Sequence, residues 1–312
     1  MALESDLLID RRRLKRGLAL WRGIAILVVL GAIALVGLES GPGRTLLGGT
    51  VARLSVSGVI TEDRERDRAL ARLADDGSVR ALVVAIDSPG GTVAGGEALH
   101  RALSAVAARK PVVAVMGGTA ASAGYMVALP AERIFAREAT VTGSIGVLMQ
   151  TTEFSELLDN LGIRAEALRS GPLKDQPSVF RPLTEEGRAA LQAVIDDLYA
   201  QFVGMVASGR RMDEARVRAL ADGRVFTGRQ AIGAGLVDAI GGEQDARSWL
   251  AAEKGVPANL PIRDVVDEDR DRLIPRLLRE ARKALVSERL SLDGMMALWH
   301  PALYGSVRGG GE

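Results

Sequence analysis

The sequence predicts an α/β protein built on a mostly parallel sheet and preceded by one N-terminal transmembrane helix. Three features point to this class: apolar runs of strand length, glycine-rich turns that follow them, and helically spaced apolar positions in between. Strand, turn, helix and strand in succession are typical of parallel layers with right-handed crossovers. The 312 residues are 47% apolar and 4% aromatic, so we expect an aliphatic core in one large domain or two smaller ones.

An apolar run near the N-terminus predicts a membrane-spanning helix. Residues 17–38 are 22 residues interrupted only by Arg22, enough at about 1.5 Å per residue to cross a bilayer core of roughly 30 Å. Five cationic residues between Arg11 and Arg16 precede the run, and the positive-inside rule predicts a cytoplasmic N-terminus. A cleaved signal peptide is the alternative, but no small-x-small site follows Leu38. We therefore expect an uncleaved anchor.

Composition divides the chain into five segments. We expect a basic cytoplasmic segment (1–16), the anchor (17–38), a linker (39–49), a globular domain (50–255) and a helical tail (256–312). The linker contains four glycines and a proline. The tail, with leucines at helical spacing, could be an outer helix, a subunit contact or a helix lying on the membrane.

Apolar patterning within the globular domain predicts its strands and helices. Strands are expected at residues 51–60, 81–86, 112–116, 133–136, 145–149 and 164–168. Helices are expected at residues 69–73, 93–108, 184–208, 212–221 and 228–233.

The composition also excludes several function classes. The chain has no cysteine and two histidines, so disulfides, thiol nucleophiles and Cys- or multi-His-ligated metals are not expected. No cofactor motif is found. With 40 Lys and Arg against 39 Asp and Glu, the net charge is +1, which gives no reason to expect a nucleic-acid partner.

A glycine pair follows the apolar run 81–86, in the sequence Asp-Ser-Pro-Gly-Gly that ends at Gly91. Adjacent glycines before a helix can expose backbone N–H groups, which form a natural oxyanion site. An ordinary strand-to-helix turn is the alternative.

Ser122 follows the run 112–116 in a segment of alanines and glycines. A serine at such a strand-to-helix junction is accessible to a substrate, and the following N–H can face the same reacting oxygen. The alternative is a simple helix N-cap. The segment does not match the G-x-S-x-G elbow.

A nucleophilic serine needs a base. His100 reads as a helix-packing or surface histidine, and His300 lies in the tail. A lysine can serve when desolvation keeps it neutral, whereas arginine cannot. Lys174, one of five lysines, lies in a Gly/Pro-rich loop, although a solvated loop lysine is the alternative. The hydroxyls of residues 140–144, including Ser144, could orient a lysine amine, or the segment could be a structural turn.

The order of these motifs resembles the signal peptide peptidase SppA family, membrane-anchored Ser-Lys serine peptidases related in fold to Clp proteases and crotonases. The resemblance covers about residues 51–250. Its most specific pieces are IDSPGG (86–91), AASAGYMVA (120–128), TGSIGV (142–147), and SGPLKD (170–175) followed by FRPLTEEGR (180–188).

The resemblance implies repeated β-β-α layers of the ClpP/crotonase type with flanking helices. It places the nucleophile on Ser122, the general base on Lys174, a lysine-orienting serine on Ser144, and the oxyanion donors on the N–H groups of Gly91 and Ala123. Many family members have glycine where Ala123 stands, a change that keeps the backbone donor.

The resemblance also implies a setting for this chemistry. Short family members form a ring-like homo-oligomer in which serine and lysine come from neighbouring subunits. We expect a bacterial inner-membrane enzyme whose peptidase domain lies outside the cytoplasm and cleaves remnant signal peptides and other hydrophobic or unfolded peptides. The rival functions are a crotonase-like acyl-CoA enzyme and a catalytically silent membrane scaffold.

Overall fold

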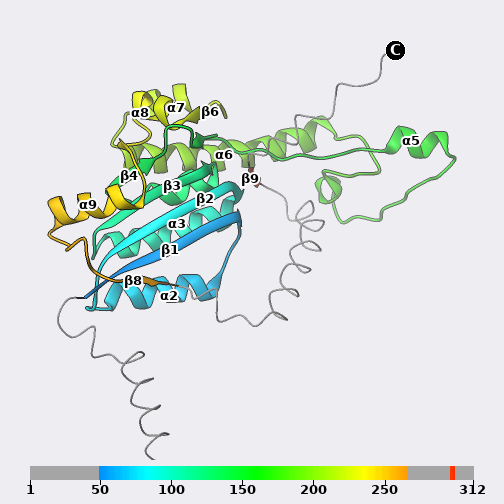
Figure 1. Ribbon diagram of the computed structural model, residues 1–312. Helices are drawn as coiled ribbons and strands as arrows, with labels where there is room; N and C mark the ends of the chain where they lie inside the picture. Colours follow the sequence, from blue (N-terminus) through cyan, green and yellow to red (C-terminus); the bar gives the residue numbers. More distant parts are fainter. Residues whose placement is uncertain (1–48, 266–295, 299–312) are drawn as a thin grey trace, which may run out of the picture. The chain divides into compact units, whose positions relative to one another are not determined.

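A single mostly parallel sheet organises the described part of the chain. The computed structural model describes residues 49–265 and 296–298 (Figure 1). The strands follow one another in the order β6-β5-β3-β2-β1-β8, with β4 on β3, β7 on β4 and β9 on β2. They are β1 (Thr50–Ile60), β2 (Val79–Thr92), β3 (Val112–Ala121), β4 (Arg133–Ala136), β5 (Val141–Gly143), β6 (Val225–Thr227), β7 (Ala239–Ile240), β8 (Ile262–Asp264) and β9 (Met296–Leu298).

Helices connect these strands and cover the sheet. They are α2 (Arg64–Asp75), α3 (Val93–Ala107), α4 (Ala123–Ala128), α5 (Ser155–Asn160), α6 (Glu185–Arg210), α7 (Glu214–Leu220), α8 (Gly228–Ala234) and α9 (Glu243–Lys254), with a 3-10 turn, η2 (Pro172–Asp175). The crossovers β1-α2-β2 and β2-α3-β3 join parallel strands. The predicted α/β class is therefore confirmed.

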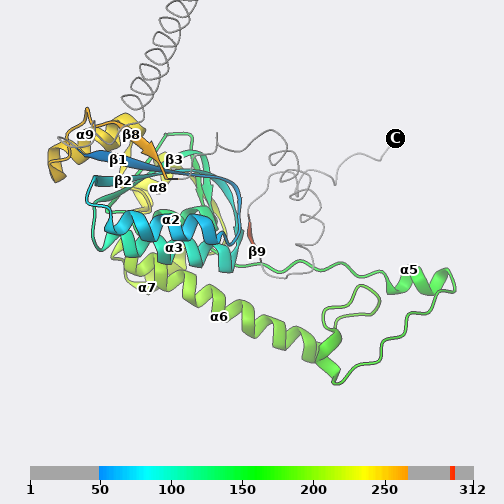
Figure 2. The ribbon, with the colours of Figure 1, turned by 90° about the horizontal axis from the view of Figure 1, so that it is seen from below.

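The two faces of the sheet pack against different helices. Along β2, Leu82, Val84 and Ile86 belong to the larger core beneath α2, α3 and α4. The alternate residues Ala81 and Val83 belong to a second core that includes residues of α9. Figure 2 shows α2 and α3 on one side of the strands and α9 on the other. Because side chains alternate between faces, a strand buried on both sides reads as a continuous apolar run.

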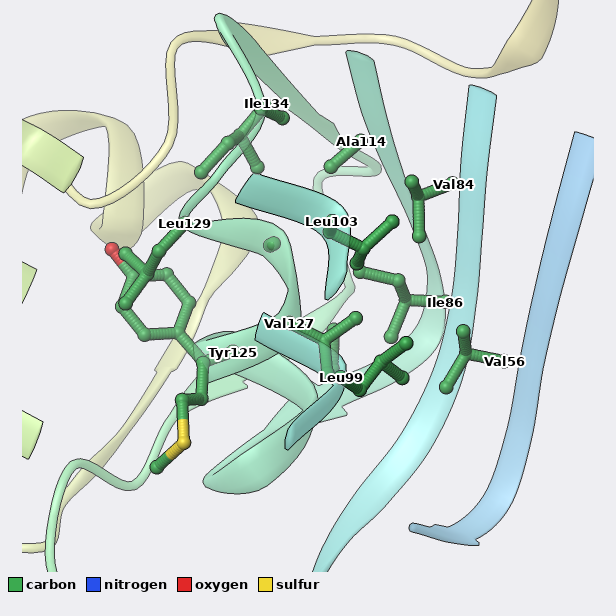
Figure 3. Packing of buried hydrophobic residues seen from close by; sticks show 14 of the residues in the cluster. Val56, Val84, Ile86, Leu99, Leu103, Ala114, Tyr125, Val127, Leu129 and Ile134 are labelled. Atoms are coloured by element: carbon green, nitrogen blue, oxygen red, sulfur yellow. The ribbon is translucent and has the colours of Figure 1, made fainter. Parts of the chain in front are cut away.

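Helix α4 lies inside the larger core, and all six of its residues are buried. In Figure 3 its Tyr125 and Val127 lie among the aliphatic side chains that the sheet and α3 contribute. The Tyr125 hydroxyl donates a hydrogen bond to the carbonyl of Leu236 at 2.8 Å. This helix is therefore fixed in position along its whole length.

Two predicted strands are wrong. Residues 145–149 were expected to form a strand, but the strand in this region is β5, which ends at Gly143. Gly143 and Ser144 both have positive φ, 81° and 49°, and they turn the chain out of the sheet. Residues 164–168 also form no strand. Leu168 is 96% exposed, so this apolar pattern does not reflect packing within the chain.

We call residues 144–184 the arm. The arm joins β5 to α6 and extends away from the sheet as far as α5 (Figures 1 and 2). Most of the exposed large apolar side chains of the described residues belong to it, including Phe154, Leu161 and Phe180. The arm therefore presents apolar surface that its own domain does not cover.

Helix α6 connects the arm to the domain. Its 26 residues span about 39 Å. Burial is concentrated in its C-terminal half, at Phe202, Val203 and Val206. At its last residue, Arg210 forms an ion pair with Asp238, whose side chain also accepts a hydrogen bond from the N–H of Ile134 at 2.8 Å. The C-terminal half is thus fixed to the sheet.

Several predicted segments lie outside the described residues. These are the basic segment 1–16, the anchor 17–38, most of the linker 39–49 and most of the tail 256–312. Among the helices of residues 49–265, none combines the length and apolarity needed to cross a bilayer.

Candidate active site

Ser122 occupies the single residue between the end of β3 and the start of α4. Its backbone has φ 56° and ψ −119°, a combination that non-glycine residues rarely adopt. Within the described part of the chain, three non-glycine residues have positive φ, and two of them are Ser122 and Ser144. Such strain persists only where the surrounding structure enforces it, and it clusters at functional sites.

The side chain of Ser122 makes no capping hydrogen bond to α4, so the interpretation as a simple N-cap is wrong. The residue is 1% exposed, and its carbonyl accepts the hydrogen bond from the Met126 N–H at 3.0 Å. The serine is thus built into the start of a buried helix, and the expectation that it is accessible to a substrate is wrong for the single chain.

Ser144 lies beside Ser122 at the end of the neighbouring strand. In the parallel β3–β5 pair, Ala121 lies opposite Gly143, so the two serines each follow one member of that pair. The N–H of Ser122 donates to the Gly143 carbonyl at 2.9 Å, and the N–H of Ser144 donates to the Arg224 carbonyl at 2.8 Å. The structure therefore brings together two of the predicted site residues.

The predicted turn before Gly91 is in fact the continuation of β2, which runs to Thr92. Gly91 pairs with Ile60 of β1. A Cβ atom at Gly91 would lie 1.9 Å from the Ile60 carbonyl oxygen, which no side chain can tolerate. The glycine is therefore required by the close approach of β1, and its N–H belongs to a strand that is buried at this point.

Small residues let α4 approach β2 and α3. A Cβ atom at Gly124 would lie 2.9 Å from the Ser88 carbonyl oxygen, and one at Gly96 would lie 2.9 Å from the Ala123 Cβ. Ala123 is the first residue of α4, so its N–H has no acceptor within the helix. The two predicted oxyanion donors, Gly91 and Ala123, thus belong to elements in direct contact.

Lys174 lies in η2, on the arm, with an exposed side chain. The turn is held by Asp175, which forms ion pairs with Arg181 at 2.5 Å and Arg169 at 3.4 Å. Among the described residues, no hydrogen bond joins Lys174 to Ser122 or Ser144. The structure of one chain therefore does not assemble the predicted pair of serine and lysine.

His100 lies on α3 and is partly buried, and this burial lowers its pKa. No hydrogen bond links its ring to Ser122 in the region described. Residues 49–265 also contain no group of three or more His, Asp or Glu side chains arranged to hold a metal ion.

Three structural features near the site were not predicted from the sequence. Strand β9, from the C-terminal tail, pairs antiparallel with β2 and places Ala297 opposite Gly91. The ion pairs of Asp175 were not predicted, although Arg181 lies in a motif that carried the resemblance. The buried hydroxyl of Ser88 also had no assigned role. Only the run Met-Met-Ala-Leu-Trp at 295–299 carried a strand-like signal for the first of them.

The site thus combines a buried, strained serine at a strand-to-helix junction with the glycines of β2 and the closely packed helix α4. Residues 104–257 match the model of peptidase family S49. The chain belongs to this family, which includes SppA, and is a serine peptidase. The resemblance drawn from the motifs is thereby confirmed.

Relatives support this assignment over much of the chain. A Synechocystis sp. protein named as a candidate protease is 39% identical over 73% of this chain and 82% of its own length. A candidate signal peptide peptidase SppA of Enterococcus faecium is 34% identical over 65% of this chain and 63% of its own. Protease 4 of Salmonella typhi is 35% identical over 64% of this chain, which covers 34% of that longer protein.

Among solved structures, a point mutant of ClpP1 from Listeria monocytogenes aligns with a TM-score of 0.41 and 17% identity. That alignment covers 62% of this chain and 92% of the other.

Proposed function

We propose that this chain is a membrane-anchored endopeptidase in which Ser122 is the nucleophile and Lys174 the general base. The observation that carries the proposal is the backbone strain at Ser122. This serine is buried, and its side chain makes no capping hydrogen bond to α4. Peptides are the substrate class because the chain is an S49 peptidase.

The reaction is acyl transfer. Neutral Lys174 accepts the Oγ proton of Ser122 while the Oγ–C bond forms and the peptide carbonyl oxygen becomes an oxyanion, held by the N–H groups of Gly91 and Ala123. The C–N bond then breaks, the leaving amine takes the proton, and water hydrolyses the ester. Ser144, beside Ser122, orients the lysine amine.

The dyad forms between chains in this proposal. Lys174 is exposed on an arm that extends from its own domain, and the arm carries the apolar side chains of Phe154, Leu161 and Phe180 on its surface. A second copy of the chain would bury that surface while it receives the lysine. Repeated contacts of this kind would close a ring of chains. Such a ring, and domains with repeated ClpP/crotonase-like layers, are what the motifs led us to expect.

The substrate binds as an extended strand beside Gly91. The pairing of β3 with β2 ends at Ser88 and Ala120, and β9 pairs with Gly90, Gly91 and Thr92 beyond that point. Peptides commonly bind by adding a strand to a sheet. Because β9 already pairs at this position, a substrate strand would take the place of β9. Backbone pairing suits hydrophobic or unfolded segments such as remnant signal peptides.

The location follows from the sequence of residues 1–38. An apolar run with a basic flank predicts a single-pass anchor in a bacterial inner membrane, with the peptidase domain on the extracytoplasmic side. Accessibility of an engineered cysteine at the exposed position Ala94, measured with a membrane-impermeant maleimide on intact spheroplasts, tests the side. The chain has no native cysteine to interfere. Labelling only after lysis would contradict this orientation.

Hydrolysis of a fluorogenic hydrophobic peptide tests the chemistry. Activity should disappear in Ser122→Ala and in Lys174→Ala, and unchanged turnover in both variants would overturn the assignment. Labelling of Ser122 by an acylating inhibitor separates the peptidase from a silent scaffold, and hydrolysis of peptides without turnover of acyl-CoA thioesters separates it from a crotonase-like enzyme.

Mixing the two inactive variants tests the shared dyad. Ser122→Ala chains still supply Lys174, and Lys174→Ala chains still supply Ser122, so co-assembled mixtures should recover part of the activity. No recovery in assemblies that demonstrably contain both variants would place serine and lysine in the same chain.

A further inference from the structure

Ser88 is a fully buried polar side chain near the candidate oxyanion site, at 0% exposure. Its hydroxyl donates to the Gly58 carbonyl at 2.6 Å and accepts from the Gly90 N–H at 3.1 Å. The same hydroxyl also donates to the Gly90 carbonyl over a longer distance of 3.2 Å. A buried hydroxyl with this many backbone contacts fixes the local course of the chain.

Ser88 contacts the peptide group that carries the candidate oxyanion donor, the Gly91 N–H. The Gly90 carbonyl and the Gly91 N–H belong to one planar peptide group. Any rotation of that plane that moves the Gly90 oxygen away from Ser88 also redirects the Gly91 N–H. Ser88 thus contacts one end of the unit whose other end would face the substrate.

The Gly90–Gly91 peptide pairs with β1 and with β9, yet its own residues give it little stiffness. It lies between two glycines, and Gly90 has φ 123°, a region open mainly to glycine. The neighbouring strands are irregular here as well, with register shifts between Ser57 and Val59 in β1 and between Ile86 and Ser88 in β2. A Gly-Gly peptide in an irregular stretch needs an added constraint to keep one orientation.

Ser88 also joins the oxyanion strand to the helix of the nucleophile. A Cβ atom at Gly124 would lie 2.9 Å from the Ser88 carbonyl oxygen. In the sheet, Ser88 pairs with Ala120 of β3. One residue therefore contacts β1 at Gly58, β2 at Gly90 and the first turn of α4.

We propose that Ser88 is a positioning residue that holds the Gly90–Gly91 peptide plane so that the Gly91 N–H points at the oxyanion. The inference rests on the proposed function of Ser122 and Gly91, and it adds a residue that acts through Gly91 and does not touch the substrate.

Ser88→Ala is the first test. Complete loss of an oxyanion donor costs about 10²–10³ in kcat, so loss of its orientation should lower kcat by about tenfold or more. KM should change by less than about twofold, because the effect falls on the transition state. Tyr199→Phe is the control, since it also deletes a hydroxyl that donates to a backbone carbonyl, that of Ala221 at 2.9 Å, on the α6 side of the domain. Its kcat should remain at the wild-type value.

An inhibitor pair keeps the test valid if Ser88→Ala folds poorly. Ser122 adds to a peptide aldehyde, and the resulting hemiacetal oxygen occupies the oxyanion position, whereas the matching peptide alcohol forms no such bond. The ratio of the two dissociation constants does not depend on the folded fraction. In Ser88→Ala, aldehyde binding should weaken about tenfold relative to alcohol binding.

Two outcomes overturn different statements. If Ser122→Ala retains hydrolysis, the proposed peptidase mechanism fails. If Ser122→Ala is inactive while Ser88→Ala keeps both the wild-type kcat per folded chain and the wild-type inhibitor ratio, the mechanism stands and the positioning role of Ser88 is wrong.

Discussion

The backbone N–H of Ser122 donates a hydrogen bond to the carbonyl of Gly143, with 2.9 Å between nitrogen and oxygen. This bond crosses from β3 to β5 at the point where both strands end. It links the candidate nucleophile to the residue before Ser144, so any shift of the β5 terminus displaces both serines together.

Gly143→Ala should therefore impair catalysis. Gly143 has φ 81°, and an added Cβ would lie 2.6 Å from the Phe226 ring, so β5 must move. We expect a loss of stability of about 1–3 kcal/mol and, because small misplacements of reacting groups are costly, a kcat at least about tenfold lower. Gly255→Ala is the matched control, with φ 62° and no atom within 4 Å of the added Cβ. Equal kcat values for the two variants would contradict the prediction.

Lys174→Arg separates charge from basicity. Arginine keeps the positive charge but stays protonated at any working pH, so it cannot accept the serine proton. Peptide hydrolysis should fall by about 10² or more, while the oligomer mass measured by analytical ultracentrifugation stays unchanged. Lys254→Arg, at a surface ion pair with Glu132, should keep full activity. A Lys174→Arg enzyme with near wild-type turnover would show that the lysine is not the base.

Asp175→Asn should weaken the presentation of Lys174. Asp175 holds η2 through Arg181 and Arg169, and ion pairs that solvent can reach contribute about 1 kcal/mol or less to stability. The melting temperature should thus change little, while kcat falls by up to about fivefold. In a double-mutant cycle with Arg181→Met, the two losses should not add. Additive losses would mean that the two residues act separately, and Glu214→Gln in α7 serves as a neutral control.

Tyr125→Phe should destabilise the domain. Burial raises the pKa of the Tyr125 hydroxyl, which therefore remains protonated and donates to the Leu236 carbonyl at 2.8 Å. Its removal leaves a buried acceptor unpaired, at a cost of about 1–3 kcal/mol. Each kcal/mol should lower the melting temperature by about 2–4 °C in a domain of this size. A melting curve identical to that of the wild type would contradict the role given to this bond.

Stability should fall at mildly acidic pH because of His100. Desolvation lowers the pKa of this histidine below its ordinary value of 6.5, so the unfolded chain binds a proton more readily than the folded chain. The stability that neutral His100 contributes to the folded chain is fully present above pH 6.5. It is lost as the pH falls toward the lower pKa of the folded state. Urea unfolding at pH 7.5 and pH 5.5 should show the difference, and His100→Gln should reduce it. An undiminished difference in that variant would assign the effect to other groups.

The strands and helices of the core were predictable because their patterns are local. The continuous apolar runs at 81–86 and 112–116 correspond to β2 and β3, since burial on both faces leaves no polar position. Helices α3 and α6 begin at or next to the predicted residues, Val93 and Thr184, because Thr92 and Thr184 cap them. Apolar spacing and caps are readable without knowledge of the partner segment.

The rest depends on contacts between distant segments. The run at 145–149 has strand-like composition, yet the positive φ values at Gly143 and Ser144 remove it from the sheet. The unusual backbone of Ser122 occurs together with the bond to Gly143 and the burial of α4, which the sequence around Ser122 does not reveal. The projection of the arm was not predictable either, because apolar residues at 154–168 resemble a core segment until their exposure is known.

Under the proposed sharing of the dyad, the arm would make activity depend on the number of chains present. If Lys174 serves the Ser122 of a neighbour, a newly synthesised chain is inert until it meets another copy. At concentrations below the assembly threshold, the rate should then rise more steeply than in proportion to the amount of protein. At low concentration the chains would remain inactive, and clustering of chains in the membrane would start proteolysis.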